Sequence, residues 1–290
     1  MSRASSHLNE KNMESRPVSV RIAGYQGWLI QKYDTTDFFD CMRVFLASKL
    51  KSQAAFKTSK DCEVYRLSKD GGDIYIKRYF FYRLKQYLQT LLDVNKAQKS
   101  CRIGRILIAK GIHTPLPILY IRHKKSFLKS EHIIVTEGIA NSMSLRDYVH
   151  NHFQSYKQKL SEKRRFIKSV AEFLGNLHLA GIYHGDLTGS NILIERINGP
   201  GQVCVHLIDL DSIRSTRRIS TRRRLKNLDE LGRNFLDLNV IGIYDRAKFL
   251  KHYLRTYTKE KRQFRQLFEA IKRRTEYRLI KHGQQFINRG

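Results

Sequence analysis

The sequence predicts an α+β fold of two lobes, a small β-rich amino-terminal lobe and a larger helical carboxy-terminal lobe. Two observations predict it. Alternating polar and apolar segments with turn signals fill the chain up to about residue 138, and apolar residues at helical spacing dominate beyond it. We therefore expect lobes at 17–138 and 139–290. Residues 1–16 are polar, lack the apolar stretch of a secretory signal, and are predicted to form a disordered leader.

The first strands and the first helix precede residue 80. Residues Val18–Ile30 alternate as a pair of short strands, and the apolar residues within 38–46 fit an amphipathic helix. The residues on both sides of the turn Asp70-Gly71-Gly72-Asp73 alternate as well. This pattern predicts a β-hairpin that places Lys77 near the end of its second strand.

One further helix is expected among the strands of this lobe. Apolar residues within Asn95–Lys110 recur at helical spacing, and Gly111 follows where a C-terminal cap belongs. Two prolines then prevent the helix from continuing. Two more strands are predicted at Leu119–Ile121 and His132–Thr136, separated by a basic turn.

The carboxy-terminal lobe begins with an apolar helical face at Phe166–Leu177, which Gly181 ends. The turn Asn198–Gly201 leads to a predicted buried strand at Val203–Leu210. From Leu225 onward the pattern is helical and basic.

Composition limits the class of protein. The 55 Lys and Arg residues outnumber the 26 Asp and Glu residues, which gives a formal charge of +29 and favours an anionic partner. The four cysteines lie far apart without a CxxC pair, so we expect neither a disulfide-rich scaffold nor a zinc ribbon. We expect reduced thiols in a cytosolic protein instead. Charged residues interrupt every apolar run before the roughly 18 residues that a spanning helix needs.

Three residues of the carboxy-terminal lobe have the pattern of phosphoryl transfer. Asp186 lies five residues before Asn191 on a loop between an apolar helix and an apolar strand, and Asp209 follows the apolar run Val205–Ile208. In such a reaction one carboxylate orients or accepts the proton of the attacking hydroxyl, and an amide oxygen and a second carboxylate hold Mg²⁺ against the phosphates. An upstream strand lysine neutralises phosphate charge, and Lys77 has that place in the order of elements.

The segments HGDLTGSNILI at 184–194 and IDLDSIR at 208–214 carry a family resemblance. They resemble the lipopolysaccharide kinase (Kdo/WaaP) family of the protein-kinase-like superfamily. Asn227–Phe235 is similar to a downstream helix of that family, and Arg105–Pro117 to its helix-to-strand joint. The resemblance implies a two-lobed protein-kinase-like fold that binds ATP and Mg²⁺.

The resemblance also implies roles for matching positions. Asp186 would be the catalytic base, and Asn191 and Asp209 would hold Mg²⁺ and with it the nucleotide. Lys77 would be the catalytic lysine that binds the ATP phosphates.

The remaining implied roles concern the hinge and the support of the loop. Thr136–Ile139 would be the hinge that holds adenine through backbone groups, with Glu137 and Ile139 as the contacts. His184 would brace the catalytic loop by hydrogen bonding. Asp211 has two open interpretations, a metal contact or an anchor for nearby backbone or arginine.

Three features depart from the protein-kinase pattern. The turn Lys57–Asp61 before Lys77 contains no glycine-rich loop, so backbone binding of the phosphates is in question. The helix at Asn95–Lys110 contains no acid, so the usual Lys–Glu pair has no candidate there. Gly185 replaces the arginine of His-Arg-Asp, which favours a constitutively formed site.

The function that the resemblance implies is transfer of phosphate from ATP to a sugar hydroxyl of the lipopolysaccharide inner core, on Kdo or heptose. The expected partners are the anionic glycolipid lipid A–core and the cytoplasmic face of the inner membrane of a Gram-negative bacterium, where the protein would be peripheral. The basic segment Arg214–Lys226 is either a solvated loop or a clamp for an anionic substrate or membrane. Residues 246–290, also basic, fit helices that pack on the core or contact a membrane.

Two other classes of function remain open. The first is a RIO-like protein kinase or another small-molecule kinase. The second is a non-catalytic basic pseudokinase or a nucleic-acid-binding protein, although no nucleic-acid-binding motif is present and nucleic acid is not an expected partner. A metal site at His150 and His152 is less expected than a surface pair, because no third ligand has suitable spacing.

Overall fold

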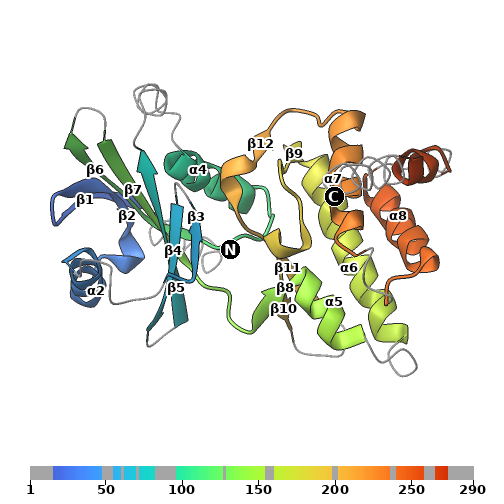
Figure 1. Cartoon of the computed structure of the whole chain (residues 1–290), viewed down its shortest axis with the longest axis horizontal. Helices are drawn as coiled ribbons and strands as arrows, with labels where there is room; N and C mark the ends of the chain where they lie inside the picture. The colour runs from blue at the N-terminus through green and yellow to red at the C-terminus, as the bar shows by residue number, and fades with distance from the viewer. Residues whose placement is uncertain are drawn as a thin grey trace, which may run out of the picture. The chain divides into compact units, whose positions relative to one another are not determined.

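The computed structural model contains two compact units, which are described separately (Figure 1). Unit 1 is Met1–Ile106 with Pro115–Ala140, and unit 2 is Leu107–Thr114 with Asn141–Gly290. The structure describes residues 16–47, 55–59, 62–69, 72–81, 96–126, 129–153, 160–197, 202–235, 240–257 and 265–273. The predicted leader, apart from residue 16, the whole turn Asn198–Gly201 and parts of the turns Lys57–Asp61 and Asp70–Asp73 lie outside these residues.

Unit 1 is built on a seven-stranded antiparallel sheet with the order β1-β2-β6-β7-β5-β4-β3. The predicted strand pair and the two strands of the predicted hairpin are present, and the strands predicted at 119–121 and 132–136 are longer, at Pro117–Ser126 and Lys129–Glu137. Its strands are β1 (Pro17–Ile22), β2 (Tyr25–Ile30), β3 (Lys57–Ser59), β4 (Cys62–Lys69), β5 (Gly72–Phe81), β6 (Pro117–Ser126) and β7 (Lys129–Glu137).

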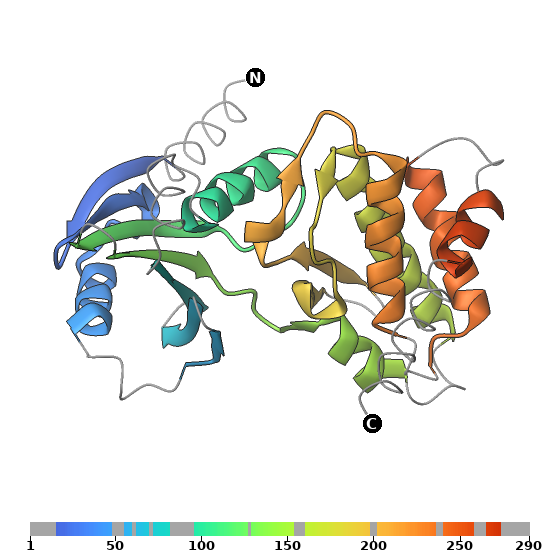
Figure 2. The ribbon, with the colours of Figure 1, turned by 45° about the horizontal axis from the view of Figure 1, so that its top comes forward.

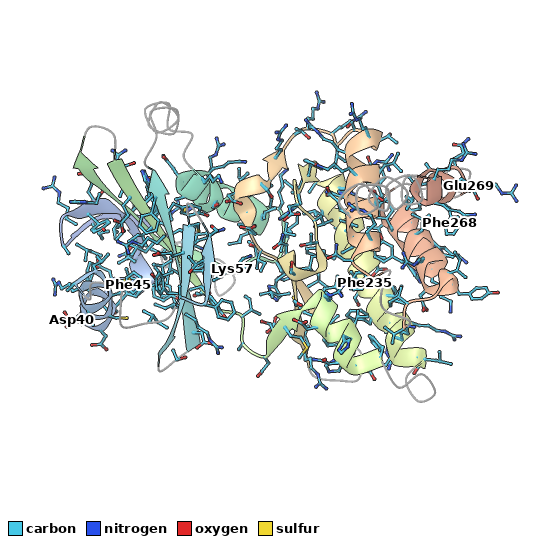
Figure 3. The ribbon with its side chains drawn as sticks, in the orientation of Figure 1. Asp40, Phe45, Lys57, Phe235, Phe268 and Glu269 are labelled. Carbon is cyan, nitrogen blue, oxygen red and sulfur yellow. The ribbon has the colours of Figure 1, made fainter. Side chains whose placement is uncertain are left out.

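Two helices pack on opposite faces of this sheet. Helix α2 (Thr36–Ala47) buries Phe38 and Phe45 against one face, and Figure 3 shows Phe45 turned toward the sheet while Asp40 points away from it. Helix α4 (Lys96–Ala109) packs on the other face through Ala97 and Cys101. Because side chains alternate along a strand, the side chains of neighbouring residues of β5 lie on opposite faces of the sheet.

The predicted end of α4 at Gly111 is confirmed by its geometry. Gly111 has a φ of +69°, its N–H donates to Ile108 O at 2.9 Å, and the Ile112 N–H donates to Leu107 O at 2.9 Å. These two bonds satisfy carbonyls that a helix end otherwise leaves open, and the left-handed backbone favours glycine. The last residues of α4 and this cap lie in the short segment Leu107–Thr114, which belongs to unit 2.

Unit 2 is mainly helical (Figure 2). Helix α6 carries the predicted apolar face, with Phe166, Val170 and Leu174 buried, and it packs against α8. The buried Lys163 of α6 donates to Asp245 Oδ2 of α8 at 2.6 Å. The elements are β8 (Ser142–Ser144), α5 (Leu145–Phe153), α6 (Leu160–Leu179), β9 (Ile182–Tyr183), η2 (Gly189–Asn191), β10 (Ile192–Arg196), β11 (Val203–Leu207), η3 (Leu210–Ser212), β12 (Arg214–Ser215), α7 (Thr221–Arg233) and α8 (Ile243–Tyr257).

Three sequence-based predictions need correction. Strand β11 ends at Leu207 rather than Leu210, because Asp209 adopts a left-handed backbone with a φ of +59°. Lys77 lies in the middle of β5 rather than near its end, because pairing with β7 continues to Phe81. Helix α7 begins at Thr221 rather than at Leu225, because the side chain of Ser220 accepts from the Arg223 N–H and caps the helix.

No helix in the described part of the chain combines the length and the hydropathy that crossing a membrane requires.

Candidate active site

The loop that carries Asp186 is held at its beginning by a close backbone contact. Gly181 ends α6 with a φ of +76°, and a Cβ there would lie 1.9 Å from Thr216 O, so only glycine fits. The Thr216 N–H donates to Gly181 O at 2.9 Å, and β9 pairs with β12 immediately beyond. The chain therefore enters the loop in a fixed direction.

Asp186 and Asn191 are joined directly. Asn191 Nδ2 donates to the Asp186 backbone oxygen at 2.8 Å and to Asp186 Oδ2 at 3.2 Å. Asn191 is buried, whereas Asp186 is exposed. Because the amide nitrogen is the donor in both bonds, neither bond uses Oδ1, the atom that a cation would take. The loop thus presents an exposed carboxylate beside an oriented amide.

Both ring nitrogens of His184 form hydrogen bonds that support this loop. Its ring is buried, Nε2 lies 3.1 Å from Ile208 O, and the Asp186 N–H donates to Nδ1 at 3.2 Å. A carbonyl only accepts, so Nε2 carries the proton and Nδ1 accepts. Burial lowers the pKa of His184, in keeping with a neutral ring. The predicted bracing by hydrogen bonds is confirmed.

Asp209 lies at the turn that follows β11. The Ile208 N–H donates to Asn191 O at 3.0 Å, so the backbone that carries Asp209 is bonded to the residue that supplies the amide. The left-handed backbone of Asp209 is uncommon for a residue other than glycine, although Asp tolerates it better than most. Asp209 and Asn191 are therefore brought to neighbouring backbone positions, as the sequence predicts. Asp211 follows in η3, and its two interpretations stay open.

Asn227 of α7 is a site-supporting residue that sequence reasoning did not single out. It is fully buried, its Nδ2 donates to His184 O at 2.6 Å, and its Oδ1 accepts from the His184 N–H at 3.3 Å. His178 Nε2 contacts the same Oδ1 at 3.3 Å, and His178 Nδ1 lies 2.9 Å from Tyr253 Oη. Burial lowers the pKa of His178 to about 4, so its ring is neutral. Hydrogen bonds thus connect Tyr253 of α8 through His178 of α6 and Asn227 of α7 to the backbone of His184.

A second asparagine of α7 supports the other end of the loop. Asn234 Oδ1 accepts from the Gly189 N–H at 3.1 Å, and Asn234 Nδ2 donates to Glu230 O at 2.8 Å. Asn227 and Asn234 lie seven residues apart, about two helical turns, and so share one face of α7. The segment Asn227–Phe235, which the sequence marks only by resemblance, therefore holds the loop at two points.

Gly185 is required by packing. A Cβ at this position would lie 2.9 Å from Ser212 O, and the Gly185 N–H donates to that oxygen at 3.3 Å. The arginine of the usual His-Arg-Asp motif has no space here. The departure seen in the sequence thus follows from the close approach of η3.

Lys77 belongs to unit 1, on the same face of the sheet as α4. It pairs with Val64 of β4 and Ile134 of β7, and its side chain is half-buried with Nζ 5.3 Å from the centre of the Tyr79 ring. Helix α4 contains no acid along its whole described length, Lys96–Ala109. The Lys–Glu pair of protein kinases therefore has no candidate in this helix.

The predicted hinge also belongs to unit 1. The Glu137 N–H donates to Leu116 O at 2.9 Å, and the Gly138 N–H donates to Asp73 O at 2.7 Å. The Glu137 carboxylate accepts from the Tyr33 hydroxyl, so this side chain is fixed by unit 1. These bonds order the backbone from Glu137 toward Ile139, and the adenine contact of both residues stays a prediction.

The basic segment divides into packed and exposed residues. Arg223 and Lys226 of α7 lie over the ring of Tyr183, at 5.6 and 5.8 Å from its centre, and Arg224 lies 4.1 Å from the centre of the Tyr257 ring. Arg223 and Lys226 therefore pack next to the loop that carries Asp186, and Arg224 packs against α8. The exposed members are Arg214, Arg217, Arg218 and Arg222.

Residues 49–270 match the family profile described as the lipopolysaccharide kinase (Kdo/WaaP) family. The chain belongs to this family. Its members are kinases, which are phosphotransferases, and the recognition made from the loop motifs is confirmed.

Two curated relatives are similar over part of the chain. The lipopolysaccharide core heptose(I) kinase WaaP of Pseudomonas aeruginosa is 25% identical over 175 residues, 59% of this chain and 64% of that protein. The protein of the same name from Escherichia coli is 23% identical over 204 residues, 68% of this chain and 76% of that protein. The chain thus spans less than two thirds of the Pseudomonas protein.

A solved structure of WaaP in complex with acyl carrier protein resembles this chain with a TM-score of 0.58 and 20% identity. The similarity covers 77% of this chain and 87% of that one. At this identity the likeness establishes the fold, and the predicted protein-kinase-like fold is confirmed.

Proposed function

We propose that this protein transfers the γ-phosphoryl group of ATP to a sugar hydroxyl of the lipopolysaccharide inner core. The observation that carries the proposal is the exposed Asp186 carboxylate beside the buried Asn191 amide. The backbone of Asn191 is in turn bonded to Ile208, the residue before Asp209. Asp186 orients the attacking hydroxyl and accepts its proton. Asn191 and Asp209 hold the cation that a nucleotide brings, and Lys77 neutralises phosphate charge.

The donor atoms fit Mg²⁺. A carboxylate and an amide oxygen are hard ligands, and two protein ligands leave coordination positions for phosphate oxygens and water. Hydrogen bonds to Asp186 fix the orientation of the Asn191 amide, so its oxygen is preorganised. When bound, Mg²⁺ would neutralise charge on the transferring phosphate. Glu137 and Ile139 would contact adenine through their backbone.

Heptose is the sugar that the relatives favour, because both are named core heptose(I) kinases. Kdo is the alternative within the family name. The acceptor would be the anionic lipid A–core, which matches a formal charge of +29. We further propose that the protein works at the cytoplasmic face of the inner membrane of a Gram-negative bacterium. The exposed arginines at 214–222 would attract the anionic surface at about 1 kcal/mol per charge.

The experiment uses the full chain with radiolabelled ATP and magnesium, and dephosphorylated lipopolysaccharide core as acceptor. We expect labelled core, and mass spectrometry then assigns the phosphate to heptose or Kdo. The Asp186→Asn variant should lose activity by about 10²- to 10⁴-fold because the proton acceptor is gone. Ser190→Ala is the matched control, an exposed residue of the same loop, and should retain activity.

Three results would overturn the proposal in different ways. Full activity of Asp186→Asn would exclude catalysis through this loop. Transfer to protein or to an aminoglycoside, with none to the core, would favour the alternative kinase classes. Binding to nucleic acid that weakens steeply with salt, without phosphate transfer, would favour a non-catalytic basic protein.

A further inference from the structure

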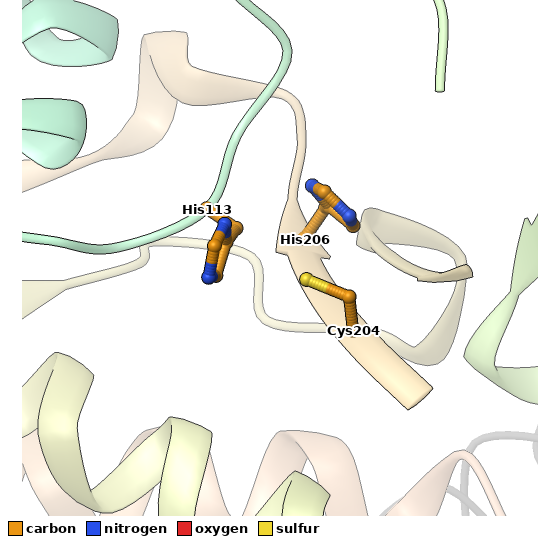
Figure 4. Close-up of side chains that lie close together, drawn as sticks. All are labelled: His113, Cys204 and His206. Atoms are coloured by element: carbon orange, nitrogen blue, oxygen red, sulfur yellow. The ribbon is translucent and has the colours of Figure 1, made fainter. Parts of the chain in front are cut away.

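A group of three metal-binding side chain types lies in unit 2, away from the loop just described. His113, Cys204 and His206 each offer one ligand atom, and these atoms lie within 4.8 Å of one another. The two histidine rings meet edge to face with centres 5.5 Å apart. Figure 4 shows the sulfur of Cys204 directed toward the ring of His113. His113 is exposed and Cys204 half-buried, so an ion has access from solvent.

His206 provides an independent sign of a ligand. The residue is only 7% exposed, and its Nδ1 is buried without a hydrogen-bond partner among the described residues. Its other ring nitrogen, Nε2, lies 2.7 Å from Glu195 Oε2. A carboxylate accepts, so Nε2 carries the proton and Nδ1 has a lone pair. Metal-binding histidines are commonly oriented by a carboxylate on the second nitrogen in this way.

The backbone holds these side chains in place. Cys204 and His206 are two residues apart on β11 and so point to the same face of the sheet. Glu195 of β10 is the direct cross-strand partner of Cys204. The loop with His113 is joined to β11 by two bonds, from the Leu207 N–H to His113 O at 2.9 Å and from Thr114 Oγ1 to Leu207 O at 2.7 Å.

We propose that His113, Cys204 and His206 form a zinc site in which Glu195 orients His206 and a water molecule completes a tetrahedron. One thiolate and two imidazoles are ligands that Zn²⁺ prefers, whereas Mg²⁺ prefers oxygen. Zinc bond lengths place tetrahedral ligand atoms about 3.3–3.6 Å apart. Bringing ligand atoms from 4.8 Å to this separation requires a movement of about 1.2–1.5 Å, which the exposed side chain of His113 can make. The thiol proton is released to solvent as the sulfur binds.

The site would have a structural effect on unit 2. It joins the segment Leu107–Thr114 to β11, and β11 leads directly into Asp209. An ion that binds the folded state alone stabilises it by mass action. The proposal is independent of phosphate transfer, because none of its residues belongs to the proposed kinase site.

The test uses the full chain without a histidine tag, stripped of metal with a chelator and titrated with Zn²⁺ or Co²⁺. We expect one equivalent to bind, Co²⁺ to give thiolate charge-transfer absorption, and Zn²⁺ to raise the melting temperature of unit 2. Cys204→Ser should abolish the charge-transfer band and His113→Ala should weaken binding. Glu195→Gln should weaken binding by about 10- to 100-fold. Cys62→Ser changes a half-buried cysteine of unit 1 that is not in a disulfide, and as the matched control it should leave metal binding unchanged.

The proposal is overturned if Co²⁺ binds without a thiolate band, or if Cys204→Ser and His113→Ala bind Zn²⁺ as tightly as the parent protein. Circular dichroism of each variant establishes that it is folded. Because the readouts are absorption, stoichiometry and melting, a kinase-inactive preparation still gives a decisive result.

Discussion

Lys77 of unit 1 and Asp186 of unit 2 are positioned by different kinds of interaction. Lys77 lies in the middle of β5, between β4 and β7, where backbone hydrogen bonds set its place. Asp186 lies on a loop that depends on single side chains, chiefly His184 and Asn227. A sheet register tolerates changes in side chains, but a loop held by buried amides and imidazoles does not. Substitutions around the two residues should therefore have different consequences.

Adjacent residues of β5 offer the sharpest form of this comparison. Arg78 faces the opposite side of the sheet from Lys77 and pairs with the carboxylate of Glu131, which is 1% exposed. Arg78→Met removes the cation that neutralises this buried carboxylate, so we expect unit 1 to lose about 3–5 kcal/mol of unfolding free energy. Lys77→Met should leave stability within about 0.5 kcal/mol but lower kcat by about 10²-fold.

Urea denaturation followed by the fluorescence of Trp28, the single tryptophan, measures unit 1 in both variants. Kinase assays at full folding measure the activity. If Lys77→Met destabilises the sheet as much as Arg78→Met, the lysine is a structural residue and the proposed phosphate contact is wrong.

The next largest effect is the pH dependence of unit 2. Burial lowers the pKa of His178 from 6.5 to about 4, so the unfolded chain takes up a proton in this interval and the folded chain does not. Stability is therefore fully present above pH 6.5 and falls as the pH drops toward 4, by at most roughly 3 kcal/mol. His178→Gln should reduce the dependence of unit 2 stability on pH. Part of this dependence should remain, because burial also lowers the pKa of His184.

Hydrogen exchange of amides in α6 and α7 measures this effect for unit 2 alone. In unit 1, burial lowers the pKa of His132 to about 4 as well. Urea denaturation followed by Trp28 fluorescence should therefore show that unit 1 loses stability over the same pH interval. A slope for unit 2 that is the same with and without His178 would contradict the assignment.

Removal of the Asn227 side chain should have a smaller effect on stability but a direct effect on the loop. Asn227→Ala leaves the His184 N–H and carbonyl without their buried partners, at about 1–3 kcal/mol. We expect faster hydrogen exchange of the His184 amide and a lower kcat. Asn234→Ala, which releases the Gly189 N–H of the loop and the Glu230 carbonyl at the end of α7, is the milder comparison because the His184 backbone keeps its partners. Equal protection of the His184 amide in Asn227→Ala and parent protein would exclude the anchoring role.

Elements with a regular pattern were predictable from the sequence, and contacts made by tertiary packing were not. The α4 helix and its Gly111 cap follow from apolar spacing and the special backbone of glycine. The start of α7 was missed because Arg222 and its neighbours have no apolar pattern; packing on Tyr183 and Tyr257 makes that segment helical.

The site shows the same division. Asp186 and Asn191 were singled out by their spacing on one loop and Asp209 by its place after an apolar strand, and the structure bonds Asn191 to Asp186 and to Ile208. The catalytic and metal-binding roles of the three residues stay predictions. Asn227 was not singled out, because a buried amide looks like any polar residue of a helix in the sequence. The cluster of His113, Cys204 and His206 was missed for a related reason, since the absence of paired cysteines says nothing about a mixed group that the fold assembles from distant segments.

The smallest predicted effect separates stability from function at Asp209. Its left-handed backbone costs a residue other than glycine about 1 kcal/mol, and less for Asp than for most. Asp209→Gly should therefore stabilise unit 2 by up to about 1 kcal/mol while phosphate transfer is lost, because the proposed cation ligand is gone. Asp209→Asn tolerates the same backbone and should lose activity without that gain, so urea denaturation of the two variants distinguishes relief of strain from removal of charge. A destabilised Asp209→Gly variant would mean that contacts of the Asp209 side chain outweigh the backbone strain.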